Sequence, residues 1–160
     1  MQFLLFHLGH DRYGLSTRQL LRVLPLMALK QLPQAPAYVA GLMNYHGTPV
    51  PVVDLSMLAC HTPCRAQFDT RMVLTDFAAD DGSQRLLGLM VERVSHVADM
   101  DPNLFSAPGV ANAGAPYLGK VLATDGAIVQ LVELEHLLEP EVRALLFTPD
   151  TPAPKQAAPC

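Results

Sequence analysis

The segment Cys60-His61-Thr62-Pro63-Cys64 carries the densest metal-ligand chemistry in the sequence. Thiolate and imidazole are good zinc ligands, and a structural zinc site needs four of them in a tetrahedron. This segment supplies three, and a second Cys/His pair is missing unless His96 or His136 folds nearby. A metal site at Cys60, His61 and Cys64 is therefore one interpretation, and a surface loop between two halves of the protein is the other.

Asp54 is the carboxylate that most invites a catalytic interpretation, but its neighbours Val53 and Leu55 are apolar. This setting favours a capping or turn role. The sequence contains no Gly-x-Gly-x-x-Gly, P-loop, nucleophile elbow or His-Glu-x-x-His, and its six histidines are scattered. We therefore predict no catalytic residue, no cofactor and no enzymatic activity.

The charge and aromatic content argue against a nucleic-acid partner. The 160 residues include 11 Lys and Arg against 15 Asp and Glu, a net charge of -4. An oligonucleotide-binding barrel is a further possibility for small β-barrels, but it needs a basic groove with stacking aromatic residues. The chain has no Trp, six Phe and four Tyr, without a basic run nearby. This class ranks last.

The sequence also predicts a cytoplasmic protein. No apolar run approaches the roughly 18 residues of a membrane span, and the first residues lack the basic region of a signal peptide. Three cysteines, an odd number without framework spacing, are typical of a reducing compartment.

Three hairpins should position these residues. Apolar runs flank turn residues over 3–15, 72–91 and 121–131, the last with the Asp125-Gly126 pair that favours a tight turn. Short strands at this spacing indicate small barrels or a sandwich. A short helix is expected over 139–146, with Pro140 at its first position.

A faint internal repeat indicates two copies of one β unit. Asp54 follows Gly47 by seven residues, and Glu133 follows Gly126 by seven. The two acids are 79 residues apart, and the glycines of two hairpins, Gly14 and Gly88, are 74 apart. Units of about 70–80 residues bury little core alone, so we expect them to pack face to face.

The segment from Val23 to Cys64 is nearly free of charge, with only Lys30 and Asp54. Its prolines prevent a regular central strand or helix. Such apolar loops either form an exposed patch, which usually marks a partner surface, or cap the ends of the barrels. We favour the patch.

Residues 37–58 carry a family resemblance: Gly41, then Asn44-Tyr45-His46-Gly47, then Pro51-Val52-Val53-Asp54-Leu55. This pattern resembles the signature of the CheW family, adaptors of bacterial chemosensory arrays, and the likeness extends over about residues 2–147. It implies a mostly β fold of two packed five-stranded SH3-like β-barrels with a short C-terminal helix. We expect this domain over 1–147, with a subdomain boundary near 60–70 and strands that can exchange, followed by a disordered Pro-rich tail at 148–160.

The resemblance implies a non-enzymatic adaptor. Such adaptors bridge the cytoplasmic hairpin tip of a chemoreceptor and the regulatory domain of a CheA-type histidine kinase, in the cytoplasm at receptor arrays of the inner membrane. Matched by position, receptor-binding residues fall at Thr17, Leu20, Arg22, Ala40, Gly41, His46 and Leu145. Kinase-binding residues fall at Pro25, Leu26, Met27 and Gly47.

His46 departs from the family pattern, which has Arg before the glycine. Arg is permanently charged and offers five donors, whereas His is shorter and close to neutral at pH 7. Either the receptor contact is weaker, or the partner differs from an ordinary chemotaxis receptor. A specialised pathway, such as a Wsp-like chemosensory system that controls a diguanylate cyclase, is our hypothesis.

Overall fold

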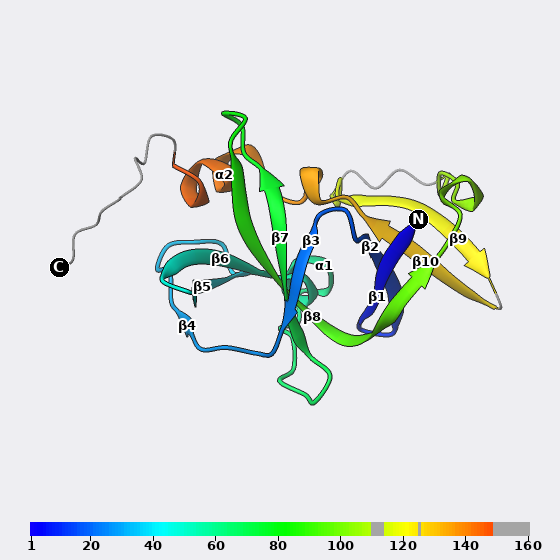
Figure 1. The fold of residues 1–160 in the computed structure, drawn as a ribbon, viewed down its shortest axis with the longest axis horizontal. Helices are drawn as coiled ribbons and strands as arrows, with labels where there is room; N and C mark the ends of the chain where they lie inside the picture. The colour runs from blue at the N-terminus through cyan, green and yellow to red at the C-terminus, as the bar shows by residue number, and fades with distance from the viewer. Residues whose placement is uncertain (110–113, 125, 149–160) are drawn as a thin grey trace.

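The computed structural model describes residues 1–109, 114–124 and 126–148, and it is mostly β (Figure 1). Within these residues ten strands form one connected sheet. They are β1 (Gln2–Leu8), β2 (Asp11–Ser16), β3 (Leu20–Leu24), β4 (Leu29–Lys30), β5 (Val39–Tyr45), β6 (Thr48–Asp54), β7 (Arg71–Ala78), β8 (Gln84–Asp99), β9 (Leu118–Thr124) and β10 (Ala127–Val132). The helices are α1 (Leu55–Cys60), α2 (Pro140–Leu146) and the 3-10 turns η1 (Pro102–Leu104) and η2 (Leu134–His136).

The long strand β8 divides the sheet into two barrels, which lie on either side of it in Figure 1. The first barrel contains β3, β7, the N-terminal half of β8, β6, β5 and the two-residue β4, in that order. The second contains the C-terminal half of β8, β1, β2, β10 and β9. The SH3-like two-barrel fold predicted from the sequence is confirmed, and the N-terminal hairpin pairs with strands from the C-terminal half of the chain.

The bend of β8 lies at Arg93, a non-glycine residue with φ of 50°. The register between β1 and β8 shifts at the same level, since Leu5 pairs with His96 and His7 with Glu92. Here β8 advances four residues while β1 advances two, and extra residues of this kind bend a strand and increase its twist. One strand can therefore serve both barrels.

Three apolar clusters fill the molecule, and strand periodicity explains them. Met72 and Leu74 of β7 point into the first barrel, whereas Val73 and Phe77 point into a core shared by both barrels. In β1 the same alternation sends Phe3 to the interior of the second barrel. Successive side chains point to opposite faces, so strands buried on both faces read as continuous apolar runs. The face-to-face packing expected from the repeat is confirmed.

The predicted hairpins all form. Strands β1 and β2, β7 and β8, and β9 and β10 pair antiparallel. Asp125 of the third turn lies outside the described residues, as does the predicted tail from residue 149 onward. No helix in the described part of the chain is long and apolar enough to cross a membrane.

Candidate functional site

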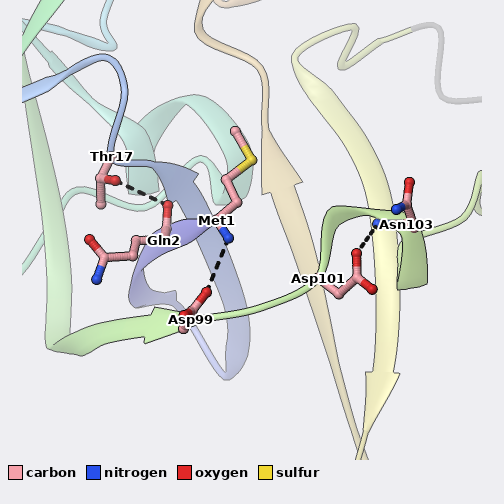
Figure 2. A network of polar contacts seen from close by, with 6 residues as sticks. All are labelled: Met1, Gln2, Thr17, Asp99, Asp101 and Asn103. Carbon is pink, nitrogen blue, oxygen red and sulfur yellow. Dashed lines mark hydrogen bonds and ion pairs between the residues drawn. The ribbon is translucent and has the colours of Figure 1, made fainter.

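The first set of predicted receptor residues lies on β3 and the turn before it. Leu20 pairs with Thr75 of β7, is half-buried and packs against the shared core. Arg22 is exposed. The Thr17 hydroxyl donates to the Gln2 carbonyl oxygen at 3.2 Å, so it faces the start of β1 (Figure 2). Arg22 is the residue of this set whose side chain projects into solvent.

The second set lies on β5 and the turn after it. Gly41 is buried with φ of 146°, and a Cβ there would collide with the Lys30 carbonyl oxygen. Only glycine adopts this conformation readily. Ala40 packs against the interior of the first barrel. His46 is exposed at the tip of the β5–β6 turn with φ of 51°. His46 is therefore the accessible residue of this set, and Gly41 has a structural reason to be glycine.

Helix α2 presents Leu145 to solvent, with 53% of its surface exposed. The opposite side of α2 is held firmly. Val142 is buried, Phe147 stacks on Phe77 with centroids 5.2 Å apart, and Arg143 forms an ion pair with Asp80 at 3.0 Å. This docking fixes the outward direction of Leu145.

Neighbours of the predicted receptor residues, and not these residues themselves, line two different depressions. Ser16 and Gln19, on the segment that carries Thr17, line a depression of about 280 Å³ against the second barrel. Thr48 of β6 and Leu146 of α2 line another of about 230 Å³. The structure thus brings the His46 turn and the Leu145 helix to one face of the first barrel, and it places the β3 residues elsewhere.

The predicted kinase residues divide in the same way between exposed and packed positions. Leu26 and Met27 are half-buried and pack against the interior of the first barrel, and the Met27 amide donates to Sδ of Met72 at 3.2 Å. They cap that barrel. Pro25 and Gly47 are exposed, and Gly47 borders a depression of about 220 Å³. The charge-poor segment therefore supplies both a cap and an exposed surface.

The expectation that the prolines of this segment prevent a central strand is wrong, because β6 contains Pro49 and Pro51 and lies between β5 and β8. Both prolines precede Val52, where the pairing with β8 begins, so neither removes a donor from that pairing.

Asp54 has the capping role predicted for it. The residue is 7% exposed, and its carboxylate accepts the Met57 amide of α1 at 3.1 Å and the Cys64 amide at 2.9 Å. Glu92 of β8, 6% exposed, accepts the Arg65 amide at 2.6 Å. Two buried carboxylates thus hold the loop of residues 61–70. No signal in the sequence points to Glu92, because 27 residues separate it from Arg65.

The cysteines in this region are not arranged as metal ligands. Within the described residues, no group of three or more His, Cys, Asp or Glu side chains could hold a metal ion. Burial, and then the nearby charge of Asp54, raises the pKa of the Cys64 thiol well above its usual range, and the thiol donates to the Met90 carbonyl oxygen. Burial also raises the pKa of Cys60. Both groups therefore favour the neutral thiol over the thiolate that binds metal.

The structure contains two surface features that the sequence reasoning did not identify. Phe68, on the 61–70 loop, is 94% exposed. A cleft of about 400 Å³ lies where α1 and the start of β5 meet the segments flanking β9 and β10. Its lining includes Tyr38 and Tyr117, and burial raises the pKa of both phenols.

Comparison with known proteins gives consistent matches over most of the chain. The model of the CheW-like domain family matches residues 2–142. Chemotaxis protein CheW of Klebsiella aerogenes is 26% identical over 147 residues, which cover 91% of this chain and 86% of that protein. Protein FrzA of Myxococcus xanthus is 28% identical over 143 residues, covering 86% and 85%. The crystal structure of the scaffolding protein TtCheW from Thermoanaerobacter tengcongensis has the same fold, with a TM-score of 0.76, 22% identity and coverage of 88% and 89%.

Proposed function

The chain belongs to the CheW-like domain family, and we propose that it is a non-enzymatic adaptor that couples a chemoreceptor to a CheA-type histidine kinase in the cytoplasm, at receptor arrays of the inner membrane. The family match carries this proposal. The absence of a metal-ligand cluster among the described residues leaves the alternative at Cys60, His61 and Cys64 without structural support.

The receptor surface we propose centres on Leu145 and His46. The depression between β6 and α2 lies beside the two segments that carry these residues. An exposed leucine beside a polar rim suits a helical hairpin tip, because the leucine buries apolar area and the rim sets the register. Ala40 and Gly41 belong to the proposed set through the shape of β5, which leads to the His46 turn. Thr17, Leu20 and Arg22 lie away from this face, and we propose them as a second, separate receptor contact.

The kinase surface we propose centres on Pro25 and Gly47, the exposed members of the set that also includes Leu26 and Met27. Leu26 and Met27 hold the segment in place through their packing against the barrel interior. A partner domain would contact the exposed end of the first barrel, next to the depression lined by Lys30, Asn44 and Gly47.

Pull-down with purified receptor hairpins and the kinase regulatory domain tests both surfaces. Leu145→Arg should abolish receptor binding and leave kinase binding intact, and Pro25→Arg should do the reverse. Ile128→Arg is the matched control, because Ile128 is 60% exposed on the second barrel. Circular dichroism should show a native fold for all three. Receptor binding that survives Leu145→Arg would refute the receptor assignment, and kinase binding that survives Pro25→Arg would refute the other.

His46 offers a separate test of partner choice. A panel of receptor tips should bind with unequal affinity if the chain serves a specialised pathway, and His46→Arg should strengthen binding to ordinary chemotaxis receptors by adding a permanent charge. Equal affinity across the panel would contradict a specialised receptor.

A further inference from the structure

Strands β6 and β8 leave a gap before their pairing begins. Their parallel ladder starts at Val52 and Gly88. In the described part of the chain, residues 48–51 and 84–87 pair with β5 and β7 on their other edges and not with each other. A depression of about 230 Å³ lies at this gap, and the end of α2 forms one of its walls (Figure 1).

Most of the surface of this depression is apolar. Pro49 is exposed, and Leu86 and Leu146 are half-buried. The apolar residues that line it are Pro49, Pro51, Leu86, Leu146 and Phe147. Proline-rich segments in the polyproline II conformation bind apolar and aromatic surfaces of this kind, because their conformation is already formed and binding costs little entropy.

Arg85 fastens the chain at the rim of the depression after α2 ends. Its Nη2 group donates to the Thr148 carbonyl oxygen at 2.8 Å, and its Cζ atom lies 5.8 Å from the centroid of the Phe147 ring. Its Nε group donates to the Ser83 hydroxyl at 3.2 Å. A guanidinium has five N–H donors, so donors remain. No carboxylate of the described residues forms an ion pair with Arg85.

The sequence that follows Thr148 matches both properties of the depression. It reads Pro149-Asp150-Thr151-Pro152-Ala153-Pro154 and lies outside the described residues. Polyproline II has three residues per turn, so Pro149 and Pro152 share one face of such a segment. Asp150 follows Thr148 by two residues, which is about 6 Å in this conformation, and therefore comes within reach of Arg85.

We propose that residues 149–154 bind in the depression between β6 and α2 of their own chain, with the prolines against Pro49, Leu86 and Leu146 and with Asp150 facing Arg85. Six residues in this conformation extend about 19 Å, and neighbouring strands are only about 5 Å apart, so the segment reaches across the gap. It begins at the rim, and short tethers give effective concentrations of about 1 mM or more. Even a weak contact is therefore populated.

The bound segment has a consequence for the receptor surface proposed above, because the depression lies beside the segments that carry His46 and Leu145. The segment competes with the receptor tip for this face. A segment bound in nine of ten molecules lowers the apparent receptor affinity about tenfold. The competition rests on the proposed function, whereas the binding of the segment does not.

Nuclear magnetic resonance of the full chain tests the binding without any receptor. Backbone amide order parameters of Thr151 and Ala153 should exceed about 0.6, whereas those of Ala157 and Ala158, beyond the segment, should fall below it. The double variant Asp150→Lys/Pro152→Gly should lower the first pair to the level of the second. It should also shift the amide resonances of the lining residues Thr48, Gln84 and Leu86.

Gln156→Lys is the matched control, because it adds a cation outside the segment and should change neither the order parameters of Thr151 and Ala153 nor the three lining resonances. All these substitutions follow the last helix, and circular dichroism verifies the folds. Thr151 and Ala153 as mobile as Ala157 would overturn the proposal, and so would lining resonances unmoved in the double variant. Order parameters that rise with protein concentration would assign the segment to a second copy, which also overturns it.

A titration with the receptor hairpin tests the competition. The double variant should bind it about threefold to tenfold more tightly than the unaltered chain, and Gln156→Lys should bind as the unaltered chain does. Equal affinity of the double variant would overturn the competition and leave the binding of the segment standing on its own measurement. Failure of the resonance test, in turn, leaves the receptor assignment to the Leu145→Arg pull-down.

Discussion

Replacing Asp54 with Ala should destabilise the protein by about 2.5 to 4 kcal/mol. The substitution removes the N-cap of α1, a change that typically costs about 1 kcal/mol. It also removes the charge-assisted bond to the Cys64 amide, typically about 1.5 to 3 kcal/mol, and leaves that amide without its acceptor. Asp54→Ser separates the two contributions, because a serine hydroxyl can still cap Met57 but does not reach Cys64. The loss of stability expected for Asp54→Ser is therefore smaller than the loss for Asp54→Ala by about 1 kcal/mol, the contribution of the cap.

Urea unfolding, monitored by circular dichroism, measures both losses of unfolding free energy. Each should shift the urea concentration at the midpoint and leave the dependence of free energy on urea unchanged. Asp101→Ala is the matched control. Asp101 is the N-cap of η1 and accepts the Asn103 amide at 2.9 Å, but in an exposed position (Figure 2). Solvent replaces that bond, so we expect a loss below about 1 kcal/mol.

A loss for Asp54→Ala that equals the loss for Asp101→Ala would refute the reasoning, because burial of the carboxylate would then contribute nothing. Pull-down of the kinase regulatory domain at a temperature where Asp54→Ala remains folded gives a second measurement. Retained binding there is expected if Asp54 acts only on stability, and lost binding would place it in the interface.

Three further outcomes are expected. Burial, and to a smaller extent the nearby charge of Asp11, raises the pKa of Tyr13 from 10.0 to about 12. Stability is therefore full below pH 10 and falls as pH rises through 12, by up to about 2 to 3 kcal/mol, and Tyr13→Phe should flatten this loss in urea titrations. Iodoacetamide at pH 8, mapped by mass spectrometry, should modify exposed Cys60 at least about tenfold faster than Cys64. Gly41→Ala should cost at least about 1 to 3 kcal/mol in thermal unfolding, since φ is 146° and the added Cβ would also collide with the Lys30 carbonyl oxygen.

The internal repeat predicted from the sequence corresponds to two equivalent strand pairings, although the barrels are not contiguous halves of the chain. Val52 of β6 pairs in parallel with Gly88 of β8, and Leu131 of β10 pairs in parallel with Gly14 of β2. The offsets of 74 and 79 residues therefore relate two equivalent strand pairings. Periodicity of turns and acids was sufficient to find the units, because each unit repeats the same local pattern of strand, turn and strand.

The exposure of the proposed receptor residues was harder to predict, because position in a motif does not determine exposure. Leu20 and Leu145 are both leucines in apolar surroundings of the sequence, yet Leu20 packs on the shared core and Leu145 is 53% exposed. The difference comes from α2 docking on the β7–β8 hairpin through Phe147 and Arg143. These contacts join segments more than sixty residues apart, and no local signal reports them.

The 61–70 loop shows why the acid of the family signature is placed where β6 ends. Asp54 binds the Cys64 amide on one side, and the Cys64 thiol binds Met90 of β8 on the other. The loop then bonds to Glu92 and to Val94, the residues on either side of the bend at Arg93. Because β8 crosses from one barrel to the other at that bend, these bonds brace the junction between the barrels. Loss of Asp54 should therefore loosen the packing between barrels, and not only the first turn of α1, so amide hydrogen exchange in Asp54→Ala should accelerate on both halves of β8. Faster exchange confined to α1 would show that the loop is only an appendage of the helix.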